Sequence, residues 1–219
     1  MSPTKTRYDR VRLLEAAGRA RTRGRRRKAA ALYAEVLRVE PENDVLRRRI
    51  ALLLAQSGKL ERAAEHYRIA TRNLARKGFD AQACGVYHEA LTFLPRDASL
   101  WLGLADLKAA RGSLVDAVSL LKEGRAKQRG RRRRADAVQL LVRAHDLDPA
   151  DLDVGIDLAR LLRRTGDRAA ALRVLNRLAV EAPGSAPRRI LAAQALTAPT
   201  LMHAWCWLVA DTTSHAASG

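Results

Sequence analysis

The sequence predicts an all-α fold of stacked antiparallel helix pairs, about 12 helices in all, and three observations carry this prediction. Turn-forming, small and bulky residues recur in a fixed order along most of the 219 residues. Within each segment, apolar residues follow the three-to-four spacing of an amphipathic helix. Aromatic residues make up only 4% of the chain, which argues against a sandwich or barrel whose strands need them.

The segment 154–183 shows how one helix pair is encoded. Apolar residues follow the helical period before and after Gly166, which interrupts the pattern as a turn residue. Pro183 ends the second helix, because proline lacks the backbone donor that a helix interior needs. Ser185 is a suitable N-cap for the next helix. The segment is therefore predicted to be a helix-turn-helix unit.

The same landmarks recur in columns along the chain. Small residues at the close approach of two helices are Ala29, Ala63, Ala83, Ala117, Ala137 and Ala171. The predicted turn positions, five residues earlier, are Gly24, Gly58, Gly78, Gly112, Arg132 and Gly166. The bulky residues, four after each alanine, are Tyr33, Tyr67, Tyr87, Leu121, Leu141 and Leu175. Prolines that end helices are Pro41, Pro95, Pro149 and Pro183.

The spacing of the alanines alternates, with steps of 34, 20, 34, 20 and 34 residues. A 20-residue step has room for one helix rather than two. The segments 60–77 and 114–128 are therefore each predicted to end one repeat and to begin the next. This gives a higher-order unit of 54 residues with three helices, at 44–97 and again at 98–151.

With these columns the chain resembles a tetratricopeptide repeat (TPR) protein, and a bacterial one. The residues that match the family pattern best are Trp101, Leu104, Ala105, Gly112, Ala117 and Leu121. Lys108 departs from it, because the family favours tyrosine there. The resemblance implies a right-handed α-solenoid, in which neighbouring repeats stack to bury a continuous core.

The predicted organisation has four parts. Residues 1–9 are a lead-in, and residues 10–185 form the TPR-like solenoid, with repeats that start near residues 10, 44, 64, 98, 118 and 152. Residues 186–211 are predicted to form capping helices that break at Pro199, and residues 212–219 a disordered tail. Trp205 and Trp207 are expected to cover the last open face, and a peptide-binding aromatic pair is the alternative.

No set of residues has catalytic spacing, so the chain is predicted not to be an enzyme and to hold no cofactor or metal. His203 and Cys206 could share a helix face, but a zinc site needs about four ligands. Cys84 is interpreted as a small buried hydrophobic residue. Two cysteines, no visible secretory signal and no apolar stretch of membrane-spanning length predict a cytoplasmic protein without membrane insertion.

A concave groove is the first candidate binding surface. In the TPR family the first helix of each repeat lines a groove for peptides. The resemblance therefore implies groove positions at Arg48, Leu52, Leu102, Asp106, Ile156, Arg160 and Arg163. The clamp that some members use for a peptide carboxylate is absent, because Leu14 and Gly18 hold its positions. The arginines favour an acidic ligand through forked hydrogen bonds, and a solvated helix face is the alternative.

Two basic runs are the second candidate surface. Much of the net charge of +18 lies in residues 19–28 and 125–134, which each hold seven basic residues and no acid. Both runs are expected at helix-to-helix turns on one edge of the solenoid, where they would attract an acidic protein or a nucleic acid. The candidate residues are Arg23, Arg25, Arg26, Arg27, Arg131, Arg132, Arg133 and Arg134. A merely solubilising role is the remaining interpretation, since a GC-rich genome also enriches arginine.

The sequence thus predicts a non-enzymatic scaffold that binds a protein or peptide partner, with an acidic partner favoured by the charge. The alternative is electrostatic binding of nucleic acid through the two arginine-rich loops. That alternative requires an affinity that falls steeply with salt. No aromatic residue interleaves with the arginines, so base stacking is not indicated. A structural role in a larger assembly is a third interpretation, and the oligomeric state is not predicted.

Overall fold

The computed structural model describes residues 9–181 and 187–197. The chain divides into two compact units, Met1–Leu100 (unit 1) and Trp101–Gly219 (unit 2). Several predictions fall outside the described residues: those for Pro183, Ser185, Pro199, His203, Trp205, Cys206, Trp207 and the tail 212–219.

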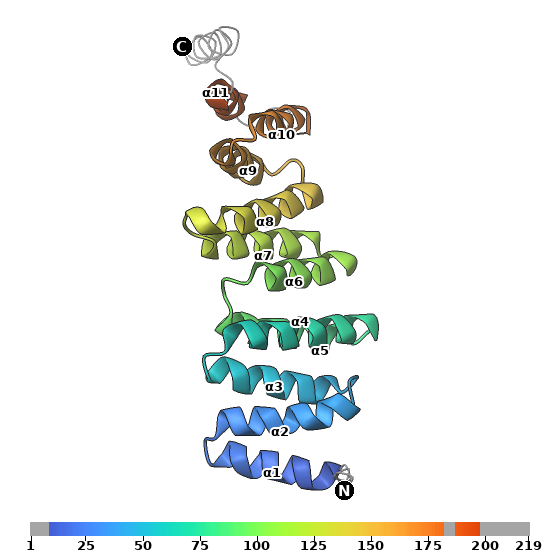
Figure 1. The fold of residues 1–219 in the computed structure, drawn as a ribbon. Coiled ribbons are helices and arrows are strands. Elements are labelled where there is room, and N and C mark those ends of the chain that lie inside the picture. Colours follow the sequence, from blue (N-terminus) through green and yellow to red (C-terminus); the bar gives the residue numbers. More distant parts are fainter. Residues whose placement is uncertain (1–8, 182–186, 198–219) are drawn as a thin grey trace, which may run out of the picture. The chain divides into compact units, whose positions relative to one another are not determined.

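Unit 1 is a stack of helices joined by short turns (Figure 1). Its helices are α1 (Arg10–Thr22), α2 (Arg26–Val39), α3 (Asp44–Gln56), α4 (Leu60–Arg76) and α5 (Asp80–Phe93). Each helix packs against the next along the chain, from α1 on α2 to α4 on α5. Because the turns are short, neighbouring helices run in opposite directions.

Unit 2 continues the same construction. Helix α6 (Ala98–Ala110) begins at the end of unit 1 and lies mostly in unit 2. The helices after it are α7 (Leu114–Lys127), the 3-10 helix η1 (Arg131–Arg133), α8 (Arg134–Leu147), α9 (Leu152–Thr165), α10 (Arg168–Glu181) and α11 (Pro187–Thr197). Helix α9 packs against α8, α10 and α11.

The predicted fold class is confirmed. The described residues form eleven α-helices and no strand, arranged as the helix pairs of a solenoid. The prediction of about 12 helices includes a second capping helix, which falls outside the described part of the chain. Among the described helices, none has the length and the apolar character that crossing a bilayer requires.

The alanine, glycine and bulky columns have the roles that the sequence predicts. All six column alanines are at most 1% exposed, and all six bulky residues are at most 8% exposed. The turn glycines have positive φ angles, from 70° at Gly24 to 96° at Gly166. Because side chains with a Cβ rarely adopt this conformation, glycine ends one helix and turns the chain into the next.

The prediction for the fifth turn is wrong at Arg132. The residue with a positive φ angle is Gly130, at 93°, and Arg132 lies within the 3-10 helix η1. The chain leaves α7 at Lys127 and needs the extra turn of η1 before α8 begins. The glycine that changes the chain direction therefore lies two residues earlier than the column places it.

Single helices occupy the two 20-residue steps. Helix α4 is one helix of 17 residues that packs against both α3 and α5. Helix α7 packs against α8, and its Gly124 faces Trp101 of α6. Each of these two helices therefore packs against both the helix before it and the helix after it, as the sequence predicts. The residue limits assigned to the lead-in, the repeats and the capping segment stay predictions.

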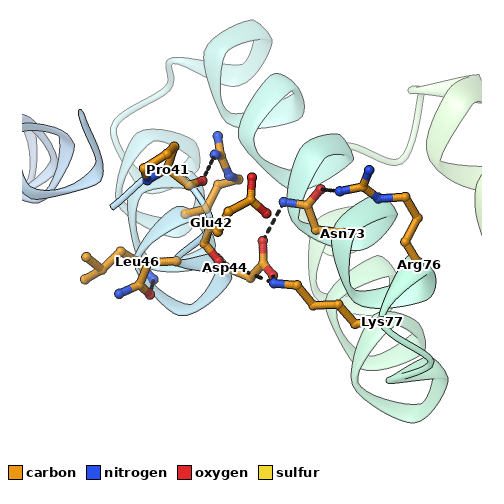
Figure 2. Close-up of polar contacts among 9 residues, drawn as sticks. Pro41, Glu42, Asp44, Leu46, Asn73, Arg76 and Lys77 are labelled. Carbon is orange, nitrogen blue, oxygen red and sulfur yellow. Dashed lines mark hydrogen bonds and ion pairs between the residues drawn. The ribbon is translucent and has the colours of Figure 1, made fainter. Parts of the chain in front are cut away.

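Polar side chains join α3 to α4 in unit 1 (Figure 2). Asn73 and Lys77, near the end of α4, both donate to the carboxylate of Asp44 at the start of α3, over 2.8 Å and 2.6 Å. Arg76 donates to the side-chain oxygen of Asn73 at 3.2 Å. Asn43 caps α3 by accepting from the backbone N–H of Leu46. These bonds fix the end of α4 to the beginning of α3.

Candidate partner-binding surfaces

The predicted groove arginine of unit 1 already has a partner. Arg48 on α3 donates to one carboxylate oxygen of Glu89 on α5, with its Nε at 3.0 Å. The hydroxyl of Tyr67 donates to the other oxygen at 3.0 Å. The hydrogen bond to Glu89 raises the pKa of Arg48, while burial and then Glu89 raise the pKa of Tyr67. Arg48 therefore carries its own counter-charge, beside a half-buried Leu52.

The predicted groove residues on α6 are placed at the surface of unit 2. Leu102 is half-buried and Asp106 is exposed. The carboxylate of Asp106 accepts from Nε of Arg143 on α8 at 2.7 Å. Because this acid is paired, it offers little net charge to a basic ligand.

The three predicted groove residues on α9 have different environments. Ile156 is 3% exposed and packs against Leu178 and Ile190, so its side chain belongs to the core. Arg163 donates to the backbone carbonyl of Leu196 near the end of α11, at 3.2 Å. Arg160 is exposed, and no described residue pairs with it. Only Arg160 is both charged and available to a ligand.

A cavity of about 430 Å³ lies beside Arg160, between α7, α9 and α11. Val154 and Ile156 contribute apolar surface to it. The charged side chains that line it are Lys122, Arg125, Asp153, Asp157, Arg160 and Arg189. The cavity thus combines an apolar floor with a charged rim, and apolar lining with a few polar groups is typical of ligand pockets.

Ion pairs hold most of this rim in place. Arg125 pairs with Asp157 at 2.9 Å, and Arg189 pairs with Asp153 at 2.7 Å. These two pairs join α7 and α11 to α9. Arg160 is the lining cation to which no described carboxylate is paired. The cavity therefore presents one uncompensated positive charge.

Lys122 of α7, one of the lining residues, donates to Asp151, the N-cap of α9, at 2.9 Å. Burial works against ionisation of Asp151, but the backbone N–H of Val154 and the Lys122 ammonium outweigh it, so the pKa of Asp151 is lowered. Asp151 therefore stays ionised and ties α7 to the start of α9.

Sequence reasoning missed the part that α7 and α11 play in this cavity. Lys122 and Arg125 are three residues apart on α7, which places them on one helix face. That spacing is the signal that could have indicated a charged face. The contribution of Arg189 from α11 depends on how α11 packs against α9, and the sequence pattern does not contain this information.

The first basic run forms the turn between α1 and α2. Arg25, Arg26, Arg27 and Lys28, called the first basic turn from here on, are all exposed. Together with Gly24, and with Ser57 from the turn between α3 and α4, they line an open cavity of about 550 Å³. None of the four side chains makes an ion pair or hydrogen bond to another described residue.

The second basic run, between α7 and α8, is partly neutralised. Arg125 pairs with Asp157, and Arg133 pairs with Asp136 at 3.7 Å. Arg129 donates to the backbone carbonyl of Ala126 at 3.3 Å. Arg131, Arg132 and Arg134 have no partner among the described residues. The two runs belong to different units, so their position on one edge stays a prediction.

No three of the described His, Cys, Asp or Glu side chains are grouped so that they could hold a metal ion. Cys84 is a free thiol and is half-buried, so the interpretation as a small buried residue holds only in part. It follows Ala83, which faces the neighbouring helix and is 0% exposed.

Comparison with known proteins finds a repeat family that part of the chain matches. Residues 129–196 match the family model described as Tetratricopeptide repeat. No curated protein matches the chain. The match covers part of unit 2, and the helix pairs with their alanine and glycine columns repeat the same arrangement through the described residues.

Several solved structures are similar to the chain. A TPR protein of Parabacteroides merdae is 15% identical over 85% of this chain and 84% of its own, with a TM-score of 0.29. PilF of Pseudomonas aeruginosa is 15% identical over 91% and 87%, with a TM-score of 0.31. A thermophilic TPR protein of Thermus thermophilus is 20% identical over 84% and 97%, with a TM-score of 0.27.

The match to the tetratricopeptide repeat model supports a protein-interaction scaffold in general terms. It gives no support to the alternative of nucleic-acid binding, which stays a prediction from charge alone. The predictions of a cytoplasmic location and of a bacterial source also stay predictions.

Proposed function

We propose that this TPR protein binds a segment of a partner protein in the cavity of unit 2, and that an acidic side chain of this segment contacts Arg160. The observation that carries the proposal is Arg160 itself, an exposed arginine at the rim of an apolar-floored cavity that pairs with no residue of the described ranges 9–181 and 187–197. An exposed guanidinium can donate two parallel hydrogen bonds to one carboxylate.

The surrounding ion pairs favour such a ligand in a second way. The pairs Arg125–Asp157 and Arg189–Asp153 order the long side chains of the rim before a ligand arrives. Binding then costs less side-chain entropy than it would on a rim of free side chains. Because Asp153 and Asp157 already neutralise Arg189 and Arg125, a carboxylate of the ligand is attracted most strongly at Arg160.

A matched pair of charge reversals tests this proposal. Random peptides displayed on phage are selected against the full chain, and the affinity of the selected peptides is measured by fluorescence anisotropy. Arg160→Glu is expected to weaken binding at least about tenfold, because a charge-assisted hydrogen bond is replaced by repulsion. Arg164→Glu is the control, since Arg164 is an exposed arginine of the same helix outside the cavity lining.

The selected peptides are expected to contain Asp or Glu. The proposal is overturned if the selected peptides bind the Arg160→Glu and Arg164→Glu variants equally well. It is also overturned if the selection yields no peptide that the wild-type chain binds. Circular dichroism of both variants checks that the helices remain formed.

A further inference from the structure

The first basic turn holds four consecutive exposed cations without a partner, more than any other turn in the described part of the chain. Four consecutive residues, Arg25 to Lys28, are cationic and exposed. The nearest acids in sequence are Glu15 and Glu35, and Glu15 is paired with Arg19 at 3.5 Å. No described carboxylate therefore lies within pairing distance of the turn.

The local backbone adds to this positive field. Gly24 has a φ angle of 70° and no atom within 4 Å of where a Cβ would lie, so the space beside the turn is open. Helix α2 begins at Arg26 with no side-chain cap and no acid in its first turn. In contrast, Asp9 caps α1 and Asn43 caps α3. The positive end of the α2 dipole is thus left without an anionic partner from the described chain.

We propose that the first basic turn is a docking surface for an acidic segment of a partner protein, whose neighbouring carboxylates enter the cavity lined by Arg25–Lys28 and Ser57. The cavity of about 550 Å³ gives room for several side chains. Arginine guanidinium groups and carboxylates make forked, charge-assisted hydrogen bonds. This surface shares no residue with the cavity around Arg160, so the proposal does not rest on the proposed function.

An acidic peptide fits the surface better than a nucleic acid does. The cavity lining contains no aromatic side chain on which a base could stack. The cations lie within about one helical turn, whereas tight binding to a nucleic-acid backbone draws on many phosphate contacts spread along the strand. The turn between α3 and α4 contributes Ser57 to the cavity lining. The hydroxyl of Ser57 donates to the Leu53 carbonyl at 2.7 Å, and this residue adds no charge.

The test compares two variants with the same loss of charge. In one, Arg25, Arg26 and Arg27 are replaced by Gln. In the other, Arg131, Arg132 and Arg134, which are unpaired among the described residues of unit 2, are replaced by Gln. Binding of a labelled oligoglutamate peptide to the full chain is measured by fluorescence anisotropy, at low and at physiological salt. Oligoglutamine, an oligothymidylate and a DNA duplex are the comparison probes.

The expected result is tight binding of oligoglutamate, weakened at least about tenfold by the Arg25–Arg27 replacement and changed less than about threefold by the other. Equal losses in the two variants would show that only net charge matters and would overturn the proposal. So would unchanged binding in the Arg25–Arg27 variant. Stronger binding of a nucleic-acid probe that depends on Arg25–Arg27 would assign the turn to nucleic acid instead. Loss of oligoglutamate binding in Arg160→Glu alone would place the ligand in the unit 2 cavity.

Discussion

The two units are built from the same kind of helix pair, but different contacts hold their shared helices. In unit 1, α4 is tied to α3 by Asn73 and Lys77, which both donate to Asp44 (Figure 2). In unit 2, α7 approaches α6 so closely that a Cβ on Gly124 would lie 2.6 Å from Cγ of Trp101. In unit 1, polar side chains hold the shared helix α4 against α3. In unit 2, the missing side chain of Gly124 lets the shared helix α7 approach Trp101 of α6.

The two units also differ in which charged side chains remain available to a ligand. Arg48 of unit 1 is part of the network with Glu89 and Tyr67, so the face of α3 keeps no free cation at this position. In unit 2 the ion pairs of the cavity rim leave Arg160 without a partner among the described residues. The comparison shows that helices of the same repeat pattern, such as α3 and α9, differ in the charge that they offer to a ligand. The difference comes from which of their side chains are already paired within the chain.

The largest expected effect is that of Gly124→Ala. The new methyl group would overlap the ring of the 4%-exposed Trp101, and overpacking of this kind costs about 1–3 kcal/mol. We therefore expect the free energy of unfolding, measured by urea titration with circular dichroism, to fall by about 2–3 kcal/mol.

Two other helical glycines sharpen this test. Gly85→Ala has nothing within 4 Å of the new Cβ, so it is expected to stabilise α5 by about 0.5–1 kcal/mol through helix propensity. In Gly155→Ala the new methyl group would meet the end of the Leu178 side chain, which can move. Its effect on the free energy of unfolding is therefore expected to lie between those of Gly124→Ala and Gly85→Ala. Equal effects of Gly124→Ala and Gly85→Ala would contradict the close approach of α7 to Trp101.

The second effect concerns the polar network of unit 1. Glu89→Ala removes the acceptor of both Arg48 and the buried Tyr67, and it is expected to lower the free energy of unfolding by about 1–2 kcal/mol. Arg48→Ala, which removes only the half-exposed partner, is expected to cost below about 1 kcal/mol. Urea titrations of both variants measure the difference. A larger loss for Arg48→Ala than for Glu89→Ala would contradict this ranking.

The smallest effect is a dependence of unit 2 on pH through His145. This residue is 4% exposed, and neither ring nitrogen has a hydrogen-bond partner among the residues that the structure describes. Burial and the nearby Arg177 lower the pKa of His145, and they outweigh Asp146, Asp148 and Asp151, which raise it.

The sign of the effect follows from the lowered pKa. The unfolded chain takes up a proton near pH 6.5, whereas folded His145 resists it, so stability is lost as the pH falls below that value. We expect urea midpoints at pH 7.5 and pH 5.5 to differ less in His145→Leu than in the wild type. An identical difference in both proteins would show that His145 is not the group responsible. His66, whose pKa is also lowered by burial, serves as a comparison through His66→Leu.

The landmarks of the fold could be predicted because each acts locally. A glycine with a positive φ angle ends a helix by its own conformation, and a column alanine such as Ala29 allows close approach at its own position. Arg132 shows the limit of this reasoning. The column spacing placed a turn there, but the chain uses Gly130 and one turn of 3-10 helix before α8.

The candidate sites were only partly predictable. Arg160 follows from the repeat pattern and lines the cavity, but Ile156 from the same pattern is in the core because α11 covers it. The role of Arg189 could not be read from the sequence, because it depends on a contact between helices that are far apart in the chain.

The sequence by itself determined the helices and all but one of the predicted turn positions, because propensity, φ angle and side-chain size are properties of single residues and their near neighbours. Only the tertiary structure decided which charges remain free. The runs 19–28 and 125–134 look alike in composition, yet Arg125 meets Asp157 of α9 while Arg25 to Lys28 meet no described acid. Charge neutralisation depends on distances of a few ångströms between side chains, and these are set by how helices pack.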